Sequence, residues 1–425
     1  MKSRILAAVL VACAAVFAGW AQNPPAPTAP AARGGFGGAA VRSPEVAQDG
    51  RVTFRLRAPN AKEVFVSGMG QRLAMQKDER GIWTATTEPM KPDLYTYSFQ
   101  VDGANFNDPS NNRFKTSFGS AGQSQVLVPG PNTWTPDPKA AKGALTRHFY
   151  NSPIVNDDRD FWVYTPAGYD PKRRESYPVF FLLHGLGDDF NSWIETGAAN
   201  VILDNLIAQG KAKPMVMVNT LGYGNSGGPS GAMQEGMLAA YARTVMEEVL
   251  PMVEKAYNVS KDRNQRAIAG LSMGGAEATF TGLQNLDKFA WIGSYSGAYV
   301  MWPGTRAEAR AGAPAAPAAA APTPPPAPAA ATPPAGGRSG RGVQSLAAGS
   351  IDKVFPKLTA AANSQIKLLW VAYGTADSLI GVNRQFKEWL DTKKVKLTYI
   401  ETPDVGHVWP LWRQYLTDFT PLLFR

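Results

Sequence analysis

The chain has 425 residues, of which 44% are apolar and 18% charged, and its Lys and Arg exceed its Asp and Glu to give a formal net charge of +9. This length and apolar content exclude a peptide-sized, disulfide-framed or wholly disordered protein, and at about 150 residues per domain they predict two or three domains. No dense basic stripe with interleaved aromatic residues is present, so we expect no nucleic-acid partner.

The first 41 residues indicate export and then a tether. Residues 1–21 combine a basic start, the apolar stretch Ile5–Phe17 and a small-x-small site at Gly19-Trp20-Ala21, which is typical of a signal peptide. The apolar stretch is shorter than the roughly 20 residues of a spanning helix, so we expect a secreted or periplasmic protein with no membrane span. The only cysteine, Cys13, lies in this leader and only weakly fits a lipoprotein site, so no disulfide is expected. Residues 22–41, rich in Pro, Ala and Gly, are predicted to be a flexible linker.

Residues 42–131 are predicted to form a small all-β sandwich. Apolar residues alternate with polar ones in Val52–Leu56 and Tyr95–Val101, Val64–Val66 is a short apolar run, and turn residues such as Asp102-Gly103 separate the segments. Short alternating strands joined by turns are typical of this architecture. The aromatic row of the last segment is interpreted as the buried face of the sandwich, with a sugar-stacking platform as the alternative.

Residues 147–425 are predicted to form an α/β domain with a mostly parallel sheet. Short apolar runs without polar alternation, typical of buried parallel strands, occur at Phe161–Tyr164, Val179–Leu183, Met215–Val218, Ala267–Ala269, Ile292–Tyr295 and Leu368–Ala372. Helical patterns lie between them at Asn200–Gln209, Met237–Tyr257, Gly275–Asn285, Val382–Leu390 and Trp409–Leu422. The Ala- and Pro-rich residues 307–349 interrupt the domain and are predicted to be a solvated loop.

The sequence Gly270-Leu271-Ser272-Met273-Gly274-Gly275 carries the sharpest chemical signal. A Gly-x-Ser-x-Gly between a strand and a helix is typical of a nucleophile elbow, a strained turn that projects the serine above the sheet. The flanking glycines allow the strand and the helix to pass closely. The N–H of Met273 is expected to point from a helix start, where orphan donors and the helix dipole favour an oxyanion. Ser272 is therefore the predicted nucleophile.

A serine hydroxyl needs a base, which is normally histidine, and the chain has three histidines. In this fold the catalytic groups follow the chain order serine, acid, histidine, so His407, in the last loop before the final helix, is the predicted base. His184 directly follows a predicted strand and begins the motif His184–Asp189. We expect this motif to form a loop, the oxyanion loop, that supplies a second oxyanion donor, the N–H of Leu186. The His184 ring is expected to support this loop. His148 is expected to precede the first strand of the domain.

The acid is expected between the serine and the histidine, after a strand. Asp377 follows Leu368–Ala372 at the carboxyl edge of the sheet, where it would hold His407 in the right tautomer. Asp404, three residues before His407, is the rival and is interpreted as a turn-former. Asp188 and Asp189 are expected to cap or brace the oxyanion loop.

Neither a dinucleotide site nor a metal site is expected. Gly222-Tyr223-Gly224-Asn225-Ser226-Gly227 matches a dinucleotide-binding pattern, but Gly228-Pro229-Ser230-Gly231 follows it instead of a helix, so a flexible pocket-lining loop is expected. No two histidines share a ligand-like spacing, so no metal or other cofactor is expected.

At these residues the chain resembles the serine esterases of carbohydrate esterase family one, the feruloyl and acetylxylan esterases. The likeness covers Arg147–Arg425 outside the Ala/Pro tract and rests on Phe161–Pro166, His184–Asp189, Arg266–Gly275, Gly374–Asp377 and Gly406–Trp412. The resemblance implies an α/β-hydrolase fold, a Ser272–Asp377–His407 triad and Leu186 and Met273 as oxyanion donors. Val46–Pro129 resembles the immunoglobulin-like early-set module that often precedes such esterases, and Asp108-Pro109-Ser110-Asn111 fits it.

The expected function is therefore that of a secreted serine esterase acting on feruloyl or acetyl esters of plant polysaccharides. A siderophore esterase of the enterobactin type, or another small-molecule esterase, is the alternative within the fold. Two other classes stay open: a catalytically inactive carbohydrate-binding protein and a surface acyltransferase. Several bulky aromatic residues are candidates for an aryl-binding slot but are interpreted mainly as packing: Trp193, Tyr223, Tyr299, Trp302 and Trp409.

Overall fold

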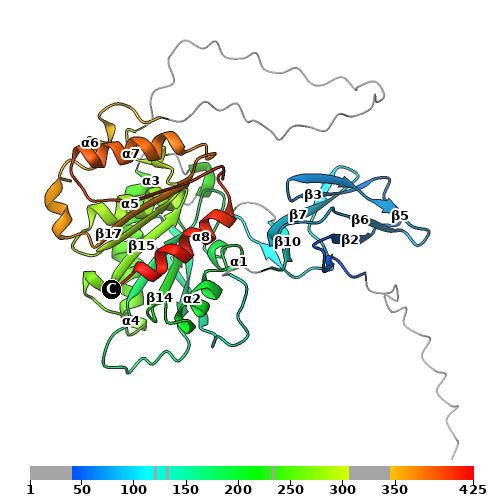
Figure 1. The fold of residues 1–425 in the computed structure, drawn as a ribbon, viewed down its shortest axis with the longest axis horizontal. Helices are drawn as coiled ribbons and strands as arrows, with labels where there is room; N and C mark the ends of the chain where they lie inside the picture. The colour runs from blue at the N-terminus through cyan, green and yellow to red at the C-terminus, as the bar shows by residue number, and fades with distance from the viewer. Residues whose placement is uncertain are drawn as a thin grey trace, which may run out of the picture. The chain divides into compact units, whose positions relative to one another are not determined.

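The computed structural model describes residues 41–118, 122–130, 134–225, 227–231, 234, 236–305 and 345–425. The predicted leader (1–21), nearly all of the linker (22–41) and most of the 307–349 tract lie outside these residues. Arg42–Arg425 groups as one unit, in which an N-terminal all-β region and a C-terminal α/β region are distinct (Figure 1). No helix in the described ranges has the length and apolar character needed to cross a membrane.

The N-terminal region consists of two β-sheets that share one core. The first sheet has the order β1 (Glu45–Val46), β2 (Val52–Arg57), β6 (Ile82–Thr86), β5 (Gln76–Lys77). The second has the order β4 (Gln71–Ala74), β3 (Val64–Gly68), β7 (Asp93–Val101), β10 (Gln123–Val128), β9 (Phe114–Lys115), with β8 (Ala104–Phe106) pairing with β7. Phe54 of the first sheet and Tyr97 of the second are fully buried, and their ring centroids lie 4.6 Å apart. The predicted two-sheet sandwich is therefore present; its immunoglobulin-like type stays a prediction.

The C-terminal region is built on an eight-stranded mixed sheet. Its order is β11 (Ala144–Ser152), β12 (Asp157–Thr165), β14 (Val216–Thr220), β13 (Val179–Leu183), β15 (Arg266–Leu271), β16 (Trp291–Tyr295), β17 (Leu368–Gly374), β18 (Thr398–Thr402). Strands β13 to β18 run parallel, and β11 and β12 pair antiparallel at one edge, which confirms the mostly parallel α/β sheet. The position expected for His148 was wrong, because this residue lies within β11, opposite Phe161.

Helices cover both faces of this sheet (Figure 1). They are α1 (Ser192–Glu195), α2 (Ala199–Ala208), α3 (Met237–Arg243), α4 (Leu250–Ala256), α5 (Met273–Gln284), α6 (Ser350–Val354), α7 (Ile380–Thr392) and α8 (Trp409–Phe419). The segment predicted as one helix from Met237 to Tyr257 is divided, because a π-helical stretch at Thr244–Val249 separates α3 from α4.

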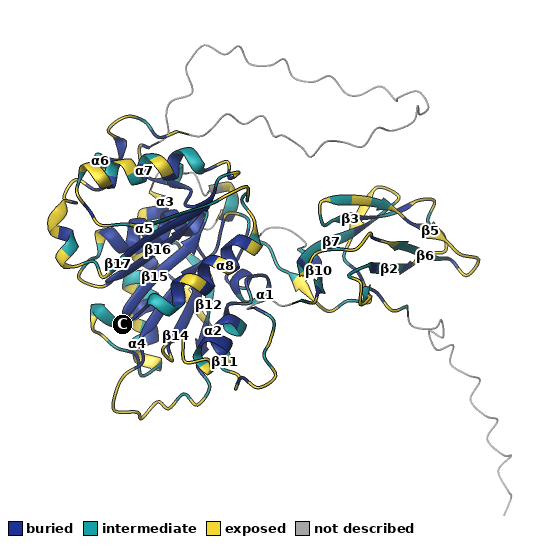
Figure 2. Ribbon diagram, in the orientation of Figure 1, coloured by how far each residue is buried: buried dark blue, intermediate teal, exposed yellow. Residues whose placement is uncertain are grey.

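The strands at the centre of the sheet are buried from both sides (Figure 2). All five residues of β13 are buried. Phe181 packs in a cluster with side chains of α3, α5 and α7, whereas its neighbour Phe180 packs in a cluster with α2 and α8. Because successive side chains of a strand point to opposite faces, covering both faces requires an unbroken apolar run.

The chain leaves and re-enters this fold at neighbouring points on either side of the Ala/Pro tract. The N–H of Ala347 donates to the carbonyl of Thr305 at 2.9 Å. Thr305 is fully buried, and its hydroxyl donates to the carbonyl of Trp302 at 2.7 Å. The two ends of the intervening residues are therefore anchored side by side.

Candidate active site

Ser272 occupies a strained turn between β15 and α5. Its φ of 54° and ψ of −116° lie outside the regions that L-residues ordinarily adopt. Two hydrogen bonds hold the turn, from the Ser272 N–H to the carbonyl of Tyr295 and from the Ala298 N–H to the Ser272 carbonyl, both 2.8 Å. Such strain persists only where the surrounding structure fixes it, which is typical of catalytic turns.

The glycines around Ser272 are required by close backbone contacts. A Cβ added to Gly274 would lie 2.5 Å from the carbonyl oxygens of Leu183 and His184, and one added to Gly270 would lie 2.4 Å from the Gly274 carbonyl. Any larger residue would therefore separate helix α5 from the strands. The prediction that these glycines serve close strand–helix passage is confirmed.

Asp377 and His407 are in direct contact. His407 Nδ1 lies 2.9 Å from Asp377 Oδ2, and Asp377 Oδ1 accepts the Leu379 N–H at 2.8 Å. The Asp377 side chain is fully buried, whereas that of His407 is 31% exposed. Burial acts to raise the pKa of Asp377, but the hydrogen bond and charge of His407 outweigh it and hold that pKa below its ordinary value. In this arrangement the Asp377 carboxylate can fix the orientation of the imidazole through Nδ1.

Two loops meet to make this contact. The loop after β17 and the loop after β18 are joined by hydrogen bonds from the Thr375 N–H to the Thr402 carbonyl, at 2.9 Å, and from the Ala376 N–H to the Val405 carbonyl, at 3.1 Å. A Cβ on Gly374 would lie 1.9 Å from the Val405 carbonyl oxygen, so only glycine permits this approach.

The rival carboxylate, Asp404, lies in a turn. It is exposed, its φ is 58°, and its N–H donates to the Thr375 hydroxyl at 2.9 Å. Within the described residues His407 hydrogen bonds to Asp377 alone, and no hydrogen bond joins its ring to the Ser272 hydroxyl. Catalytic hydrogen bonds of this kind are often long until substrate binds.

His184 orients the candidate oxyanion loop. It is fully buried; its Nε2 accepts the Gly222 N–H at 2.9 Å, so its Nδ1 carries the proton and donates to the Gly185 carbonyl at 2.8 Å. Burial lowers the pKa of His184, which keeps the ring neutral. Because the C=O and N–H of a trans peptide point in opposite directions, the Leu186 N–H points away from His184. His184 therefore acts on the loop as predicted, through the backbone.

The N–H groups of Leu186 and Met273 are available as donors. Neither has an acceptor among the described residues. Met273 begins α5, where the helix dipole adds partial positive charge. A Cβ on Gly185, next to Leu186, would lie 3.4 Å from the Ser272 Cβ, so the loop adjoins the nucleophile.

Tyr223 braces the oxyanion loop. It lies in Gly222–Gly227, the glycine pattern that is not expected to bind a dinucleotide. Its hydroxyl accepts the Gly187 N–H at 2.8 Å and donates to the Asp188 carbonyl at 3.0 Å. The expectation that no helix follows needs a correction, because Gly228–Gly231 forms a 3₁₀ turn. Four residues of 3₁₀ helix still do not provide the helix start that a pyrophosphate needs.

Glu277 is a buried carboxyl group that no sequence motif marks. It lies on α5, and its two carboxyl oxygens are buried and have no hydrogen-bond partner among the described residues. Burial raises its pKa well above the ordinary value, which favours the neutral, protonated form. A Cβ on Gly222 would contact both Glu277 and Met273, so the Glu277 carboxyl group lies close to Met273, the first residue of α5. A neutral acid there does not oppose an oxyanion.

Two further side chains lie against the acid–histidine pair: Ser296, which no sequence motif marks, and Trp412, the last residue of the Gly406–Trp412 motif. Ser296 follows β16, has a φ of 53°, and its hydroxyl helps to lower the pKa of Asp377. Trp412 donates from Nε1 to the Ser296 hydroxyl at 3.2 Å and meets the His407 ring edge-on, with centroids 4.7 Å apart. Of the aromatic candidates for a slot, four are buried in packing (Trp193, Tyr223, Tyr299 and Trp302), and Trp409 is partly exposed.

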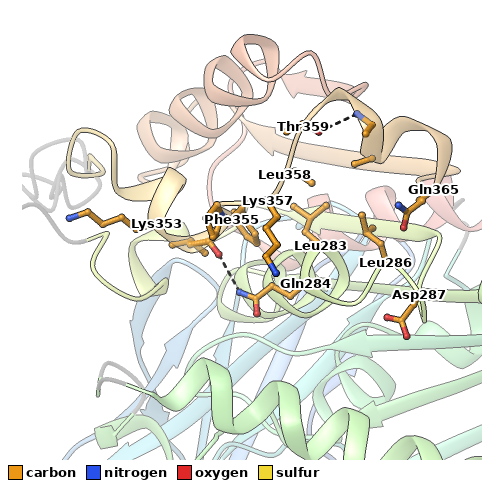
Figure 3. A pocket seen from close by; sticks show the side chains of 14 residues that line it. Leu283, Gln284, Leu286, Asp287, Lys353, Phe355, Lys357, Leu358, Thr359 and Gln365 are labelled. Atoms are coloured by element: carbon orange, nitrogen blue, oxygen red, sulfur yellow. Dashed lines mark hydrogen bonds between the residues drawn. The ribbon is translucent and has the colours of Figure 1, made fainter.

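A cavity of about 660 Å³ lies elsewhere, at the C-terminal end of α5 (Figure 3). Leu283, Phe355 and Lys357 are among the side chains that line it. Since α5 has 12 residues and a helix rises about 1.5 Å per residue, this cavity is roughly 18 Å from the Ser272 end of the helix. In the described part of the chain, no group of three or more His, Cys, Asp or Glu is arranged to hold a metal ion.

The chain is similar to known esterases. An endo-1,4-beta-xylanase/feruloyl esterase of Xylanibacter ruminicola is 34% identical over 268 residues, which are 61% of this chain and 36% of that protein. An endo-1,4-beta-xylanase Y of Acetivibrio thermocellus is 27% identical over 195 residues, 43% of this chain and 16% of that protein. The match thus spans about a third or less of these curated relatives.

Solved structures share the fold. A ferulic acid esterase from Anaeromyces mucronatus superposes with a TM-score of 0.51 at 20% identity, covering 70% of this chain and 96% of that one. An enterochelin esterase from Shigella flexneri superposes with a TM-score of 0.57 at 18% identity, covering 89% and 94%. Together with the mixed sheet, these likenesses identify an α/β-hydrolase-like fold. The family model for Esterase matches residues 152–423, and the chain therefore belongs to that family.

Proposed function

We propose that this protein is a serine carboxylic-ester hydrolase whose triad is Ser272, Asp377 and His407. The main support is the 2.9 Å contact between His407 Nδ1 and the buried Asp377 carboxylate, at the same edge of the sheet as the strained Ser272 turn. Membership of the Esterase family agrees with this chemistry.

In the first half-reaction, Ser272 Oγ attacks the ester carbonyl carbon while His407 Nε2 takes the hydroxyl proton. The carbonyl oxygen becomes an oxyanion, and the N–H groups of Leu186 and Met273 donate to it; the loss of one such donor typically costs about 10²–10³-fold in rate. Asp377 stabilises the imidazolium through Nδ1. His407 then gives its proton to the departing alcohol oxygen, and the acyl group remains on Ser272.

In the second half-reaction, water attacks the acyl-enzyme. His407 takes a proton from that water, the oxyanion forms again at the same two N–H groups, and Ser272 leaves with the proton returned by His407. The carboxylic acid is released and the free serine is regenerated.

The proposed substrates are feruloyl or acetyl esters on plant polysaccharides. The support is the 34% identity over 268 residues to an endo-1,4-beta-xylanase/feruloyl esterase. We further propose that the protein is exported through its predicted leader, and that the sandwich of residues 42–131 and the domain of residues 147–425 are its two folded domains.

The decisive experiment compares the wild-type protein with Ser272→Ala on p-nitrophenyl acetate. We expect the variant to lose at least about 10⁴-fold in kcat, because the proposed acyl-enzyme forms on the Ser272 hydroxyl, which alanine lacks. Full wild-type turnover by Ser272→Ala would refute the triad. Release rates from methyl ferulate, acetylated xylan and a catecholate ester then identify the substrate class, and a preference for the catecholate ester would favour a siderophore esterase instead.

A further inference from the structure

A segment of the N-terminal sandwich, Phe114–Phe118, contacts the candidate oxyanion loop. Lys115 Nζ lies 2.7 Å from Asp188 Oδ1. The next residue, Thr116, donates from its hydroxyl to Asp189 at 2.9 Å. The ring of Phe118 packs on Tyr223, with centroids 5.1 Å apart, and Tyr223 in turn braces the loop. Residues some 70 positions earlier in the chain therefore support the loop that adjoins Ser272.

The Lys115–Asp188 ion pair is largely removed from water. The side chains of Lys115 and Asp188 are 19% and 8% exposed. In the described part of the chain, Lys115 is the cation that forms a salt bridge with Asp188. Breaking such a pair by removing one partner leaves an uncompensated buried charge, which is strongly unfavourable.

Asp188 also lies close to the position where negative charge develops. A Cβ on Gly185 would lie 3.6 Å from Asp188 Oδ2 and 3.4 Å from the Ser272 Cβ. The Asp188 carboxylate is therefore near both the nucleophile and the Gly185–Leu186 peptide. Without a cation beside it, this carboxylate would repel an oxyanion held by that peptide, since charges interact strongly where water is excluded.

The sandwich also contacts the helix that follows His407. Arg413 of α8 is fully buried, forms an ion pair with Asp93 of β7, and donates to the Thr196 carbonyl at 2.8 Å. The Arg413 guanidinium also lies 4.8 Å from the ring centroid of Trp134. Both sides of the candidate site are thus tied to the N-terminal region.

We propose that Lys115 is a positioning residue for ester hydrolysis, which cancels the charge of Asp188 and fixes the oxyanion loop, so that the N-terminal sandwich completes the active site. The inference rests on the proposed function. Lys115 acts through Asp188 and the loop backbone and does not touch the reacting atoms.

The test is a set of full-length variants assayed on p-nitrophenyl acetate. Lys115→Met removes the cation, Lys115→Arg keeps it, and Asp188→Asn removes the carboxylate charge with little change in shape. Lys77→Met is the matched control, because Lys77 lies in the same sandwich and its Nζ donates to the Pro59 carbonyl, outside the site. Rates are expressed per active serine, counted by labelling with a fluorophosphonate, so that unfolded molecules do not contribute.

We expect Lys115→Met to lower kcat about 10- to 100-fold with KM changed less than about threefold, because a displaced or repelled oxyanion affects the transition state and not substrate binding. Lys115→Arg is expected to retain kcat within about threefold. Asp188→Asn alone is expected to be much milder than Lys115→Met, and adding it to Lys115→Met is expected to restore most of the lost rate.

The proposal is overturned if Lys115→Met keeps the wild-type kcat, if Lys77→Met loses as much, or if Lys115→Met and Asp188→Asn lose equally, as a purely structural ion pair would require. Lys115→Gln replaces the Met variant if the latter does not fold. Failure of the proposed function itself is recognised separately, because Ser272 in the wild-type protein would then not be labelled by the fluorophosphonate.

Discussion

Replacing Asp377 by Asn removes one acceptor from a position that needs two. In the structure, Asp377 Oδ1 accepts the Leu379 N–H at 2.8 Å and Oδ2 lies 2.9 Å from His407 Nδ1. An amide has only one acceptor oxygen, so in either orientation its NH₂ group faces a donor. If it faces Leu379, a buried peptide N–H loses its partner at a cost of about 1–3 kcal/mol. If it faces His407, the ring must carry its proton on Nε2.

The second orientation abolishes the base, because an imidazole protonated on Nε2 cannot accept the Ser272 proton. We therefore expect Asp377→Asn to lower kcat by about 10²–10⁴-fold, which corresponds to about 2.7–5.4 kcal/mol in the activation free energy. KM is expected to change little.

The assay is steady-state hydrolysis of p-nitrophenyl acetate, with Asp404→Asn as the control because Asp404 is exposed in its turn. Asp404→Asn is expected to retain kcat within about threefold, as substitutions at exposed positions usually do. The reasoning is refuted if the Asp404 variant suffers the large loss and the Asp377 variant keeps wild-type activity.

Two further predictions concern stability. Gly274→Ala is expected to lower the free energy of unfolding by about 1–3 kcal/mol, because its Cβ would press on the Leu183 and His184 carbonyls; a urea midpoint equal to that of the wild type would contradict this close packing. Burial holds the pKa of His184 below its ordinary value of 6.5, so the unfolded chain binds the extra proton, and the stabilisation is present above pH 6.5 and lost below it. The melting temperature of the wild type should therefore fall between pH 7 and pH 5 more steeply than that of His184→Gln, and parallel curves for the two proteins would be evidence against this linkage.

The central strands and the acid–histidine contact followed from the sequence because local and topological rules determine them. Strands such as β13 are apolar at every position, which only a doubly covered strand requires. Asp377 and His407 were predicted from the fixed order of catalytic groups and from the position of strand ends, and the structure brings their side chains together.

The edge strands of the large sheet, and the contacts between the N-terminal and C-terminal regions, could not be predicted from the sequence. β11 and β18 lie at the two edges of the sheet, and their residues are mostly exposed or half-buried, so neither shows the apolar run that marks a central strand. The Lys115–Asp188 pair joins segments far apart in the chain, and no local pattern distinguishes this lysine from a solvated one. Long-range ion pairs are a property of the tertiary fold.

The hydrogen bond between Ala347 and Thr305 has a consequence for how this protein tolerates insertions. Since departure and return of the chain are fixed at adjacent points, residues inserted between them add mainly the entropy of closing a loop, which grows by only about 0.6 kcal/mol for each doubling of length. A segment inserted at this junction is therefore expected to cost the α/β region little stability. The junction between Thr305 and Ala347 is therefore a suitable position for inserting another segment or domain.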